Sequence, residues 1–300
     1  MTQADFPSGS LWSLVQDTTQ QALQSGALEP IATQTGVLNA GELAFTVRVV
    51  DSLARKAAAR SRTAQSAPPV NPFLPYEEAL FVASLFDTHV CLLNKFNVVD
   101  HHLLMVTRQY ESQDDWLTRP DFAALARCLI EIAGLGFYNG GAAAGASQPH
   151  KHLQLVPLLD PAGTAALPIA QAIAPHRAAL KIASQVPNLP FSHSIQSYVW
   201  QSLQGSHHTL TSCLLEAYQQ IMADLGIHQQ NGQPSEPYNL LVTRDWMMGV
   251  RRSQASYEGI NVNSLGYAGW LLVKDSSGLD QLQQIGPLTL LEKVGYPLDA

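Results

Sequence analysis

The sequence predicts an α+β fold in which helices pack against a mainly antiparallel sheet. Short runs rich in β-branched and other apolar residues recur along the 300-residue chain, and separate segments carry apolar residues at helical spacing. Several strand-like runs follow one another through short turns. They do not alternate with helices in the regular order of a doubly wound parallel sheet. A hydrophobic content of 46% is enough for a sizeable core in one large domain or two small ones.

Helical and strand patterns assign the first half of the chain. In chain order they predict a helix at 11–28, strands at 44–50, 80–94 and 102–108, and a helix at 119–134. Four prolines make residues 66–79 an irregular, extended loop, and a turn over 95–100 joins two of the strands. Asp121 is the candidate N-cap of the second helix, and Gly134 is its candidate C-cap.

The second half is assigned in the same way. It predicts a strand at 151–159, a helix at 169–184 between two loops, a helix at 207–225, two strands within 238–253, a strand at 269–275 and a helical C-terminus. The two strands within 238–253 are expected to join near Arg244 and Asp245. The region from about 160 to 195 is rich in proline and alanine, which favours loops around its helix.

Charge and cysteine usage exclude several classes of protein. The net charge of −7 gives no general basic field for nucleic acid or anionic lipid. No signal peptide and no apolar run long enough to span a bilayer is seen, so we expect a cytoplasmic protein without membrane contact. Cys91, Cys128 and Cys213 lie far apart among apolar neighbours and indicate free thiols in a reducing compartment. Without a CxxC pair, the commonest structural zinc site is missing.

The most informative stretch is NGGAAAGASQPHKHLQLVPL, residues 139–158. Side chains two apart on a strand share a face, so His150, His152 and Gln154 point one way and the residues between them point the other. One interpretation is that these polar residues simply face solvent. The other is that they form one wall of a site.

The segment before the strand favours the second interpretation. Its glycines, including Gly145, are interleaved with alanines and leave backbone N–H groups bare, and such loops can hold phosphates. Asn139, Ser147 and Gln148 add side-chain donors. The loop and the polar face together predict a phosphate-bearing ligand held against an imidazole.

Neutral imidazole is a competent nucleophile toward phosphorus when its far nitrogen donates to a fixed acceptor. His152 has polar neighbours on both sides to orient it, so it is the better candidate, with His150 as the orienting or oxygen-binding partner. A zinc site is the alternative, because HxH is a common zinc fragment. The sequence does not specify a third ligand among His89, His101 and His102, and we expect no metal held by the protein alone.

HKHLQ resembles the His-x-His-x-Gln motif of the transferase branch of the histidine triad superfamily. NGGAAAGASQPHKHLQ, NPFLPYEEALFV, LLNKFNVVDHHLLMVTRQYESQ and YNLLVTRDWMMGVRRS are similar to segments of the ATP adenylyltransferases, also called diadenosine tetraphosphate phosphorylases. The resemblance runs from about residue 40 to about residue 275 in the family's order. It implies a histidine-triad-like catalytic part over residues 1–165 and a C-terminal part over residues 166–300 that completes the same globular unit.

The resemblance implies a two-step reaction. His152 would attack the α-phosphorus of diadenosine 5′,5‴-P1,P4-tetraphosphate, ATP would leave, and inorganic phosphate would then take the AMP from the imidazole to give ADP. The reverse direction makes the dinucleotide. Gln154 can donate to a non-bridging oxygen without titrating. The charge of the polyphosphate leads us to expect Mg²⁺ or another divalent cation with the substrate.

Further binding residues are implied by the same resemblance. They are His102 as the outlying triad histidine, Asn94, Lys95 and Asn97 in a nucleotide-contacting turn, Lys56 at the phosphates and Asn239 near the nucleotide. Lys274 is a further candidate from its own position, because it ends a predicted strand from which it could approach the phosphates. Each has a plainer alternative as a solvated or capping residue, and Arg55 and Arg60 are rivals of Lys56. Trp246 and Met247 are expected to be core residues rather than a platform for adenine. Arg251, Arg252 and the histidines at 176, 193, 207, 208 and 228 are interpreted as surface or helix-end residues.

Other functions remain open from the sequence. The same superfamily contains sugar-1-phosphate nucleotidylyltransferases, many of which carry a cysteine-built metal site, and dinucleoside polyphosphate hydrolases, which usually have a histidine at the place of Gln154. A nucleotide sensor that has lost catalysis is the alternative from another class. We expect a monomer. The dominant direction, the base preference, the use of adenosine phosphosulfate and the role of residues 1–40 and 160–195 are not determined by the sequence.

Overall fold

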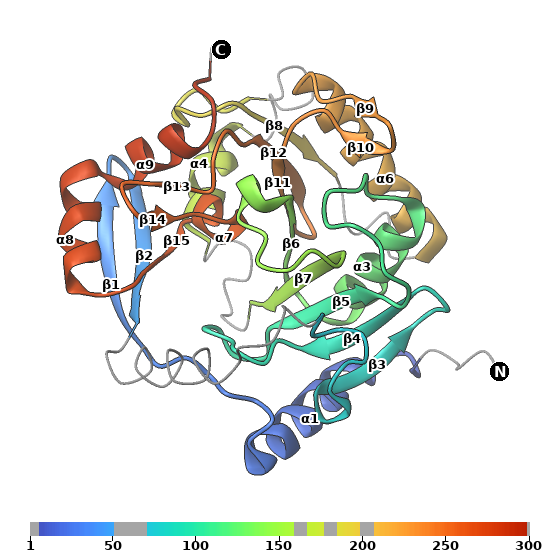
Figure 1. The fold of residues 1–300 in the computed structure, drawn as a ribbon. Coiled ribbons are helices and arrows are strands. Elements are labelled where there is room, and N and C mark those ends of the chain that lie inside the picture. Colours follow the sequence, from blue (N-terminus) through green and yellow to red (C-terminus); the bar gives the residue numbers. More distant parts are fainter. Residues whose placement is uncertain (1–5, 51–70, 159–166, 177–184, 199–206, 299–300) are drawn as a thin grey trace.

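A computed structural model describes residues 6–50, 71–158, 167–176, 185–198 and 207–298. Its centre is an eight-stranded sheet in the order β3-β4-β5-β7-β6-β11-β12-β8, and each neighbouring pair is antiparallel. The strands are β3 (Phe81–Leu85), β4 (His89–Leu93), β5 (Leu103–Thr107), β6 (Gly134–Gly140), β7 (His152–Pro157), β8 (His193–Ser197), β11 (Tyr238–Val242) and β12 (Trp246–Arg251). The predicted α+β class with a mainly antiparallel sheet is confirmed (Figure 1).

A second, three-stranded sheet lies beside the large one (Figure 1). It contains β1 (Thr33–Ala40), β2 (Leu43–Val50) and β15 (Trp270–Val273). β1 and β2 form an antiparallel hairpin, whereas β15 pairs with β2 in parallel. Two short hairpins complete the described strands, β9 (Gln229–Gln230) with β10 (Gln233–Pro234) and β13 (Ser256–Tyr257) with β14 (Ile260–Asn261).

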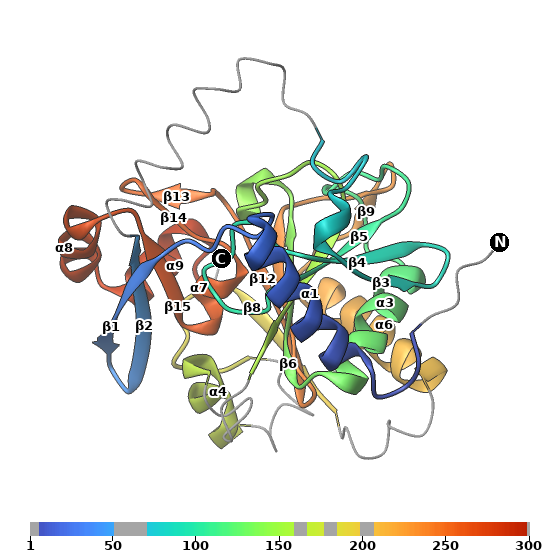
Figure 2. The same cartoon turned by 90° about the horizontal axis from the view of Figure 1, so that it is seen from below.

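Helices cover the two faces of the large sheet differently (Figure 2). One apolar cluster joins the sheet to α1 (Leu11–Ser25), α3 (Arg119–Glu131) and α6 (His207–Asp224). A second joins its other face to the three-stranded sheet and to α4 (Pro168–Ile173), α7 (Ser264–Ala268), α8 (Ser276–Ile285) and α9 (Pro287–Val294). Single 3₁₀ turns lie at η1 (Glu78–Leu80), η2 (Ala142–Ala144) and η4 (Ala174–His176).

The large sheet crosses the boundary that we placed between residues 165 and 166. β6 from the first part pairs with β11 from the second, with Asn139 opposite Asn239. β2 and β15 pair across the same boundary. The glycine-rich segment therefore packs directly against the C-terminal part. No helix in the described ranges is long and apolar enough to cross a membrane.

The ends predicted for α3 are wrong at both residues. Thr118 is the N-cap, and Asp121 is the third residue of the helix, where its carboxylate accepts hydrogen bonds from the N–H (2.7 Å) and the hydroxyl (2.7 Å) of Thr118. Ile132 is the C-cap, in extended conformation. Gly134 instead begins β6. Glycine is required there because a Cβ would lie 2.7 Å from the side chain of Leu155 on the neighbouring strand.

Three further differences concern strands and one helix. The predicted strand at 80–94 is a hairpin of β3 and β4, since Phe86, Asp87 and Thr88 turn the chain, with Phe86 at φ 58°. β6 and β8 were not predicted, because glycine and serine mask strands whose burial comes from their neighbours. The helix predicted at 169–184 is seen only as α4 and η4, and residues 177–184 lie outside the described residues.

Candidate active site

β7 carries the HxHxQ segment through the middle of the large sheet, between β5 and β6. Val106 of β5 lies opposite His152, and Phe137 of β6 lies opposite Gln154. Antiparallel partners share a face, so the two polar side chains project among apolar neighbours. The side chains of β7 are held by strands on both sides, which fixes their direction.

The predicted alternation is present, but the solvent-facing interpretation is wrong. Leu153 and Leu155 join the apolar cluster under α3. On the other face, His150 is 0%, His152 4% and Gln154 8% exposed. A polar face this deeply buried must be satisfied by the protein or by a ligand.

Phe73 covers this face from the proline-rich segment. Its ring centroid lies 5.4 Å from that of His152 and 5.7 Å from that of His150. The ring removes water from both imidazoles, which matters for their protonation.

His152 is held as a neutral imidazole in one tautomer. Its Nδ1 lies 2.8 Å from the carbonyl oxygen of His150, and because a carbonyl can only accept, Nδ1 carries the proton. Burial lowers the pKa of His152 to about 4, although the hydrogen bond to the carbonyl opposes the shift. Nε2 therefore presents its lone pair at neutral pH.

His150 orients His152 through its backbone rather than through its ring. The His150 Nε2 donates to the carbonyls of Thr107 (2.8 Å) and Gln109 (3.1 Å) and lies 2.9 Å from the Thr107 hydroxyl. Its Nδ1 accepts from the amide nitrogen of Asn71 at 3.0 Å. Both ring nitrogens have partners in the protein, which favours the orienting role for this imidazole over the oxygen-binding one. The ring ties β7 to the segments beside it.

Gln113 is a functional residue that the sequence analysis missed. Its Oε1 accepts from the backbone N–H of His152 at 2.8 Å, and its Nε2 donates to the carbonyl of Asn139 at 2.9 Å. One buried amide thus fixes the nucleophile's strand and the start of the glycine-rich loop relative to each other. Its position in the loop between β5 and α3 carries no sequence signal for this role.

His102 lies on the same face as His152 and Gln154. Burial lowers its pKa to about 4, the Gln154 amide opposes that shift, and a charge on His152 would add to it. Asn94 donates to His102 Nδ1 at 3.1 Å, so the proton is on Nε2. Within the described residues, this Nε2–H is buried without a hydrogen-bond partner.

The neighbouring His101 points away from the site, as expected for adjacent residues. Its Nδ1 lies 3.0 Å from the Thr19 hydroxyl, and its ring meets Trp12 of α1 at a centroid distance of 5.0 Å. Of the two adjacent histidines, the structure therefore brings His102 to the face that carries His152 and Gln154.

The glycine-rich loop is a closed 3₁₀ turn rather than a row of bare N–H groups. The N–H groups of Ala144 and Ala146 donate to the carbonyl of Gly141, and that of Gly145 donates to the carbonyl of Ala142. Gly145 has φ 87°, and a Cβ there would lie 2.6 Å from the Val262 carbonyl oxygen. Glycine is required at this position because the loop is pressed against the C-terminal part.

The side chains that were predicted in this loop fall into two groups. Ser147 is exposed and Gln148 is half-buried, and neither side chain makes a hydrogen bond to another described residue. The side-chain oxygen of Asn139 instead accepts hydrogen bonds from Ser264 and Asn239. Asn239 bonds to Asn139 and to the Ala144 carbonyl, both at 2.9 Å. These two asparagines hold the loop in place.

The predicted turn contributes less to a phosphate site than expected. Lys95 lies 2.8 Å from Glu77 and 3.7 Å from Glu29, and the hydrogen bond to Glu77 raises its pKa. A phosphate would have to compete with these carboxylates. Asn97 is buried and donates to the carbonyl of Val99 at 2.9 Å.

Of the two other candidate lysines, the structure describes only Lys274, and it does not bring this lysine to the histidines. Lys274 is exposed after β15 and borders a cavity beside α8 together with Val50 and Gln281. Lys56, with its rivals Arg55 and Arg60, lies outside the described residues.

Three further side chains can be compared with their predicted surroundings. Trp246 and Met247 are core residues, as expected. His193 was interpreted as a surface or helix-end residue but is fully buried, with its Nδ1 on the Phe191 carbonyl at 2.7 Å and its Nε2 accepting the Val186 N–H at 2.9 Å.

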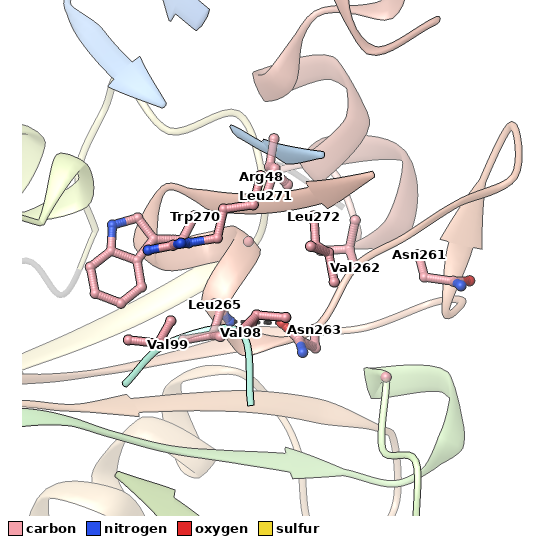
Figure 3. Close-up of a pocket in the computed structure, with 12 residues that line it drawn as sticks. Arg48, Val98, Val99, Asn261, Val262, Asn263, Leu265, Trp270, Leu271 and Leu272 are labelled. Carbon is pink, nitrogen blue, oxygen red and sulfur yellow. Dashed lines mark hydrogen bonds between the residues drawn. The ribbon is translucent and has the colours of Figure 1, made fainter. Parts of the chain in front are cut away.

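A cavity of about 110 Å³ lies between the glycine-rich loop and the three-stranded sheet (Figure 3). Val98, Val99 and Leu271 form apolar walls, and Trp270 and Asn261 lie at opposite ends of the view. Its further lining includes Arg48, Asn263 and Gly145. The Arg48 Nε is buried without a hydrogen-bond partner in the described ranges. No local pattern in β2 or β15 indicates that these strands border this loop.

Among the described residues, no three His, Cys, Asp or Glu side chains form a group that could hold a metal ion. The face around His152 offers imidazoles and an amide, whereas Mg²⁺ prefers carboxylate and phosphate oxygens. These residues do not form a resident magnesium site.

Fold and site together define a nucleotidyltransferase of the histidine triad type, with a neutral imidazole behind a glycine-rich loop. Residues 1–175 match the family model of the Ap4A phosphorylase N-terminal domain, and residues 187–297 match that of the ATP adenylyltransferase C-terminal domain. The first match alone covers more than half of the chain, so this chain belongs to the Ap4A phosphorylase family.

Individual relatives come from Saccharomyces cerevisiae. The chain is 28% identical over 265 residues to diadenosine 5′,5‴-P1,P4-tetraphosphate phosphorylase 2, covering 80% of this chain and 79% of the relative. It is 25% identical over 304 residues to Protein APA1, covering 95% and 94%. The crystal structure of yeast Ap4A phosphorylase Apa2 matches with a TM-score of 0.78 at 24% identity over 97% of this chain and 99% of that one. This structural likeness supports the fold.

Proposed function

We propose that this enzyme catalyses the reversible phosphorolysis of diadenosine 5′,5‴-P1,P4-tetraphosphate to ATP and ADP, with Nε2 of His152 as the nucleophile. The observation that carries the proposal is the hydrogen bond from His152 Nδ1 to the His150 carbonyl, which leaves a neutral ring with its lone pair on Nε2. Membership of the Ap4A phosphorylase family supports the substrate.

In the first step, the Nε2 lone pair forms a bond to the α-phosphorus, and the bond from that phosphorus to the bridging oxygen breaks. ATP leaves, and AMP remains on the imidazole. The positive charge that develops on the ring is stabilised by the His150 carbonyl, which still accepts from Nδ1. In the second step, an oxygen of inorganic phosphate attacks the same phosphorus, the P–N bond breaks, and ADP leaves.

His102 and Gln154 are placed to bind the phosphoryl oxygens. The His102 Nε2–H is buried without a partner among the described residues, and a non-bridging oxygen would satisfy it. Gln154 offers an uncharged donor that does not titrate. These donors stabilise charge that is spread over the equatorial oxygens in the transition state.

The divalent cation is expected to come with the substrate. We propose that Mg²⁺ or another divalent cation enters with the polyphosphate, because the described residues around the histidines offer no carboxylate set for it. The cavity lined by Trp270 and Arg48 is mostly apolar and has a few polar groups, as nucleoside sites usually are, and we propose that the base of one adenosine binds against it.

One chain supplies His102, His152, Gln154 and the glycine-rich loop, so we propose a monomer as the functional unit. Cys91, Cys128 and Cys213 are free, and a contact between Cys91 and Cys128 raises the pKa of the Cys128 thiol. Neighbouring free thiols in the core favour a reducing, cytoplasmic setting.

The first test is incubation of the purified protein with diadenosine tetraphosphate and Mg²⁺, with and without inorganic phosphate, followed by separation of the nucleotides. ATP and ADP formed only with phosphate are the expected result. ATP and AMP formed without phosphate would mean a hydrolase. No product would contradict the proposal and return attention to sugar-1-phosphates or to nucleotide sensing.

A further inference from the structure

Arg252 was interpreted from the sequence as a surface residue, but it is fully buried just after β12. Its Nε donates to the carbonyl of Val294 at 3.0 Å. One Nη donates to the carbonyls of Gln254 (2.7 Å) and Val262 (3.0 Å). The guanidinium thus joins α9 to the segment that precedes α7.

The other Nη of Arg252 faces the glycine-rich loop. It donates to the Ala144 carbonyl at 3.2 Å and to the side-chain oxygen of Asn239. The amide nitrogen of Asn239 donates in turn to the same Ala144 carbonyl and to the Asn139 side chain. A single guanidinium therefore holds the loop directly and through an asparagine pair.

The charge of Arg252 has no acidic partner among the described residues. Within the described part of the chain, no carboxylate lies within the 4.0 Å of an ion pair, and its polar partners are carbonyl and amide oxygens. Its neighbour Arg251 differs, because its guanidinium forms a bidentate ion pair with the carboxylate of Glu236 at 2.9 Å. A buried cation without a counter-ion is costly for folding, so its persistence calls for a role.

We propose that Arg252 is a positioning residue for the polyphosphate: it holds the glycine-rich loop, and its positive charge, which no described carboxylate neutralises, favours phosphate at that loop. This proposal rests on the proposed function only in taking the loop as a phosphate site. Field lines from a buried charge pass through protein of low polarisability, so salt screens them less than those of a surface lysine. Arginine suits this place because its planar fork serves several acceptors at once.

The test compares Arg252→Gln and Arg252→Lys with Arg251→Gln as the matched control. Thermal melting first establishes that each variant folds. Calorimetric titration then measures affinity for adenosine, AMP, ADP and ATP with Mg²⁺. We expect Arg252→Gln to bind ATP about tenfold more weakly than the wild type, whereas its affinity for adenosine should change by less than about twofold. Each added phosphate should therefore increase the affinity less in this variant than in the wild type.

Arg252→Lys keeps the charge but not the fork, and we expect an intermediate loss for ATP. Arg251→Gln is expected to match the wild type throughout. If folded Arg252→Gln binds all four ligands like the wild type, or loses adenosine and ATP equally, the inference is wrong, because a merely structural role does not depend on phosphate number.

A variant of Arg252 that does not fold is replaced by Asn239→Ala, which leaves the guanidinium and its hydrogen bond to the Ala144 carbonyl in place and removes its second link to the loop, through Asn239. A greater loss for ATP than for adenosine would again support the proposal, and equal losses would contradict it. Wild-type protein that binds no ATP at all would overturn the proposed function, and this inference with it. Unaltered ATP binding in the variants would overturn this inference alone.

Discussion

The Nδ1 of His152 lies 2.8 Å from the carbonyl oxygen of His150, two residues earlier on the same strand segment. His193 shows the same arrangement with Phe191, at 2.7 Å, but there the second ring nitrogen accepts the Val186 N–H. The two histidines share a local geometry and differ in what the other nitrogen meets. A buried imidazole becomes a nucleophile candidate only where the fold leaves that nitrogen to a ligand.

Replacement of His152 by alanine is expected to abolish turnover and to preserve nucleotide binding, because only the covalent step needs the imidazole. A fall in kcat of at least about 10³-fold is expected. Product analysis and ATP titration check it, with exposed His228→Ala as the control. Unchanged turnover in the variant would remove His152 as the nucleophile.

Gln154→His is expected to shift the second step from phosphate toward water. An imidazole at this position can take a proton from water, which an amide cannot. The ratio of AMP to ADP in the products should rise, by up to about a hundredfold. A ratio equal to that of the wild type at the same phosphate concentration would show that this side chain does not select the acceptor.

The acid limb of the first half-reaction is expected near the pKa of His152, which burial lowers to about 4. The neutral ring is the active form, so activity should persist as the pH falls through 6.5 and decline only toward pH 4. Single-turnover release of ATP without inorganic phosphate measures this step, since phosphate itself titrates near neutrality. An acid limb centred at 6.5 would contradict a buried neutral nucleophile.

Stability should also depend on pH through His102 and His152. Both pKa values fall from 6.5 in the unfolded chain to about 4 in the folded one, so the unfolded state binds protons first. The free energy of unfolding should therefore decrease as the pH falls from 6.5 toward 4, by about 1.4 kcal/mol per pH unit for each histidine. Denaturant titrations at several pH values check this, and His152→Gln should reduce the slope.

Gln113→Met is expected to lower stability and catalysis together. The change leaves the His152 N–H and the Asn139 carbonyl without their buried partner. Such unsatisfied groups cost about 1–3 kcal/mol. Denaturant unfolding and kcat are the measurements, with exposed Gln230→Met as the control. Wild-type values for both would show that the strand and the loop do not depend on this amide.

Local patterns predicted much of the fold because their causes are local. The alternation of β7 follows from strand geometry at any burial. The first helix was also predicted, although its predicted end at residue 28 was wrong, because Gly26 with φ 76° ends α1. β6 was missed because its residues GLGFYNG have weak strand propensity, and it forms only because β7 and β11 pair with it on both sides. Asp121 was misplaced at the helix start because Thr118 and Asp121, three positions apart, are both residue types that cap helices.

The sequence by itself determined the family resemblance, the shared face of His150, His152 and Gln154, and the order of most elements, because these depend on neighbouring residues. Tertiary structure alone decided the protonation state of His152, the selection of His102 over His101, the pairing of Lys95 with Glu77 and the burial of Arg252. Each of these depends on partners brought together from distant parts of the chain. Burial, charge and hydrogen bonding at a site are properties of that assembly.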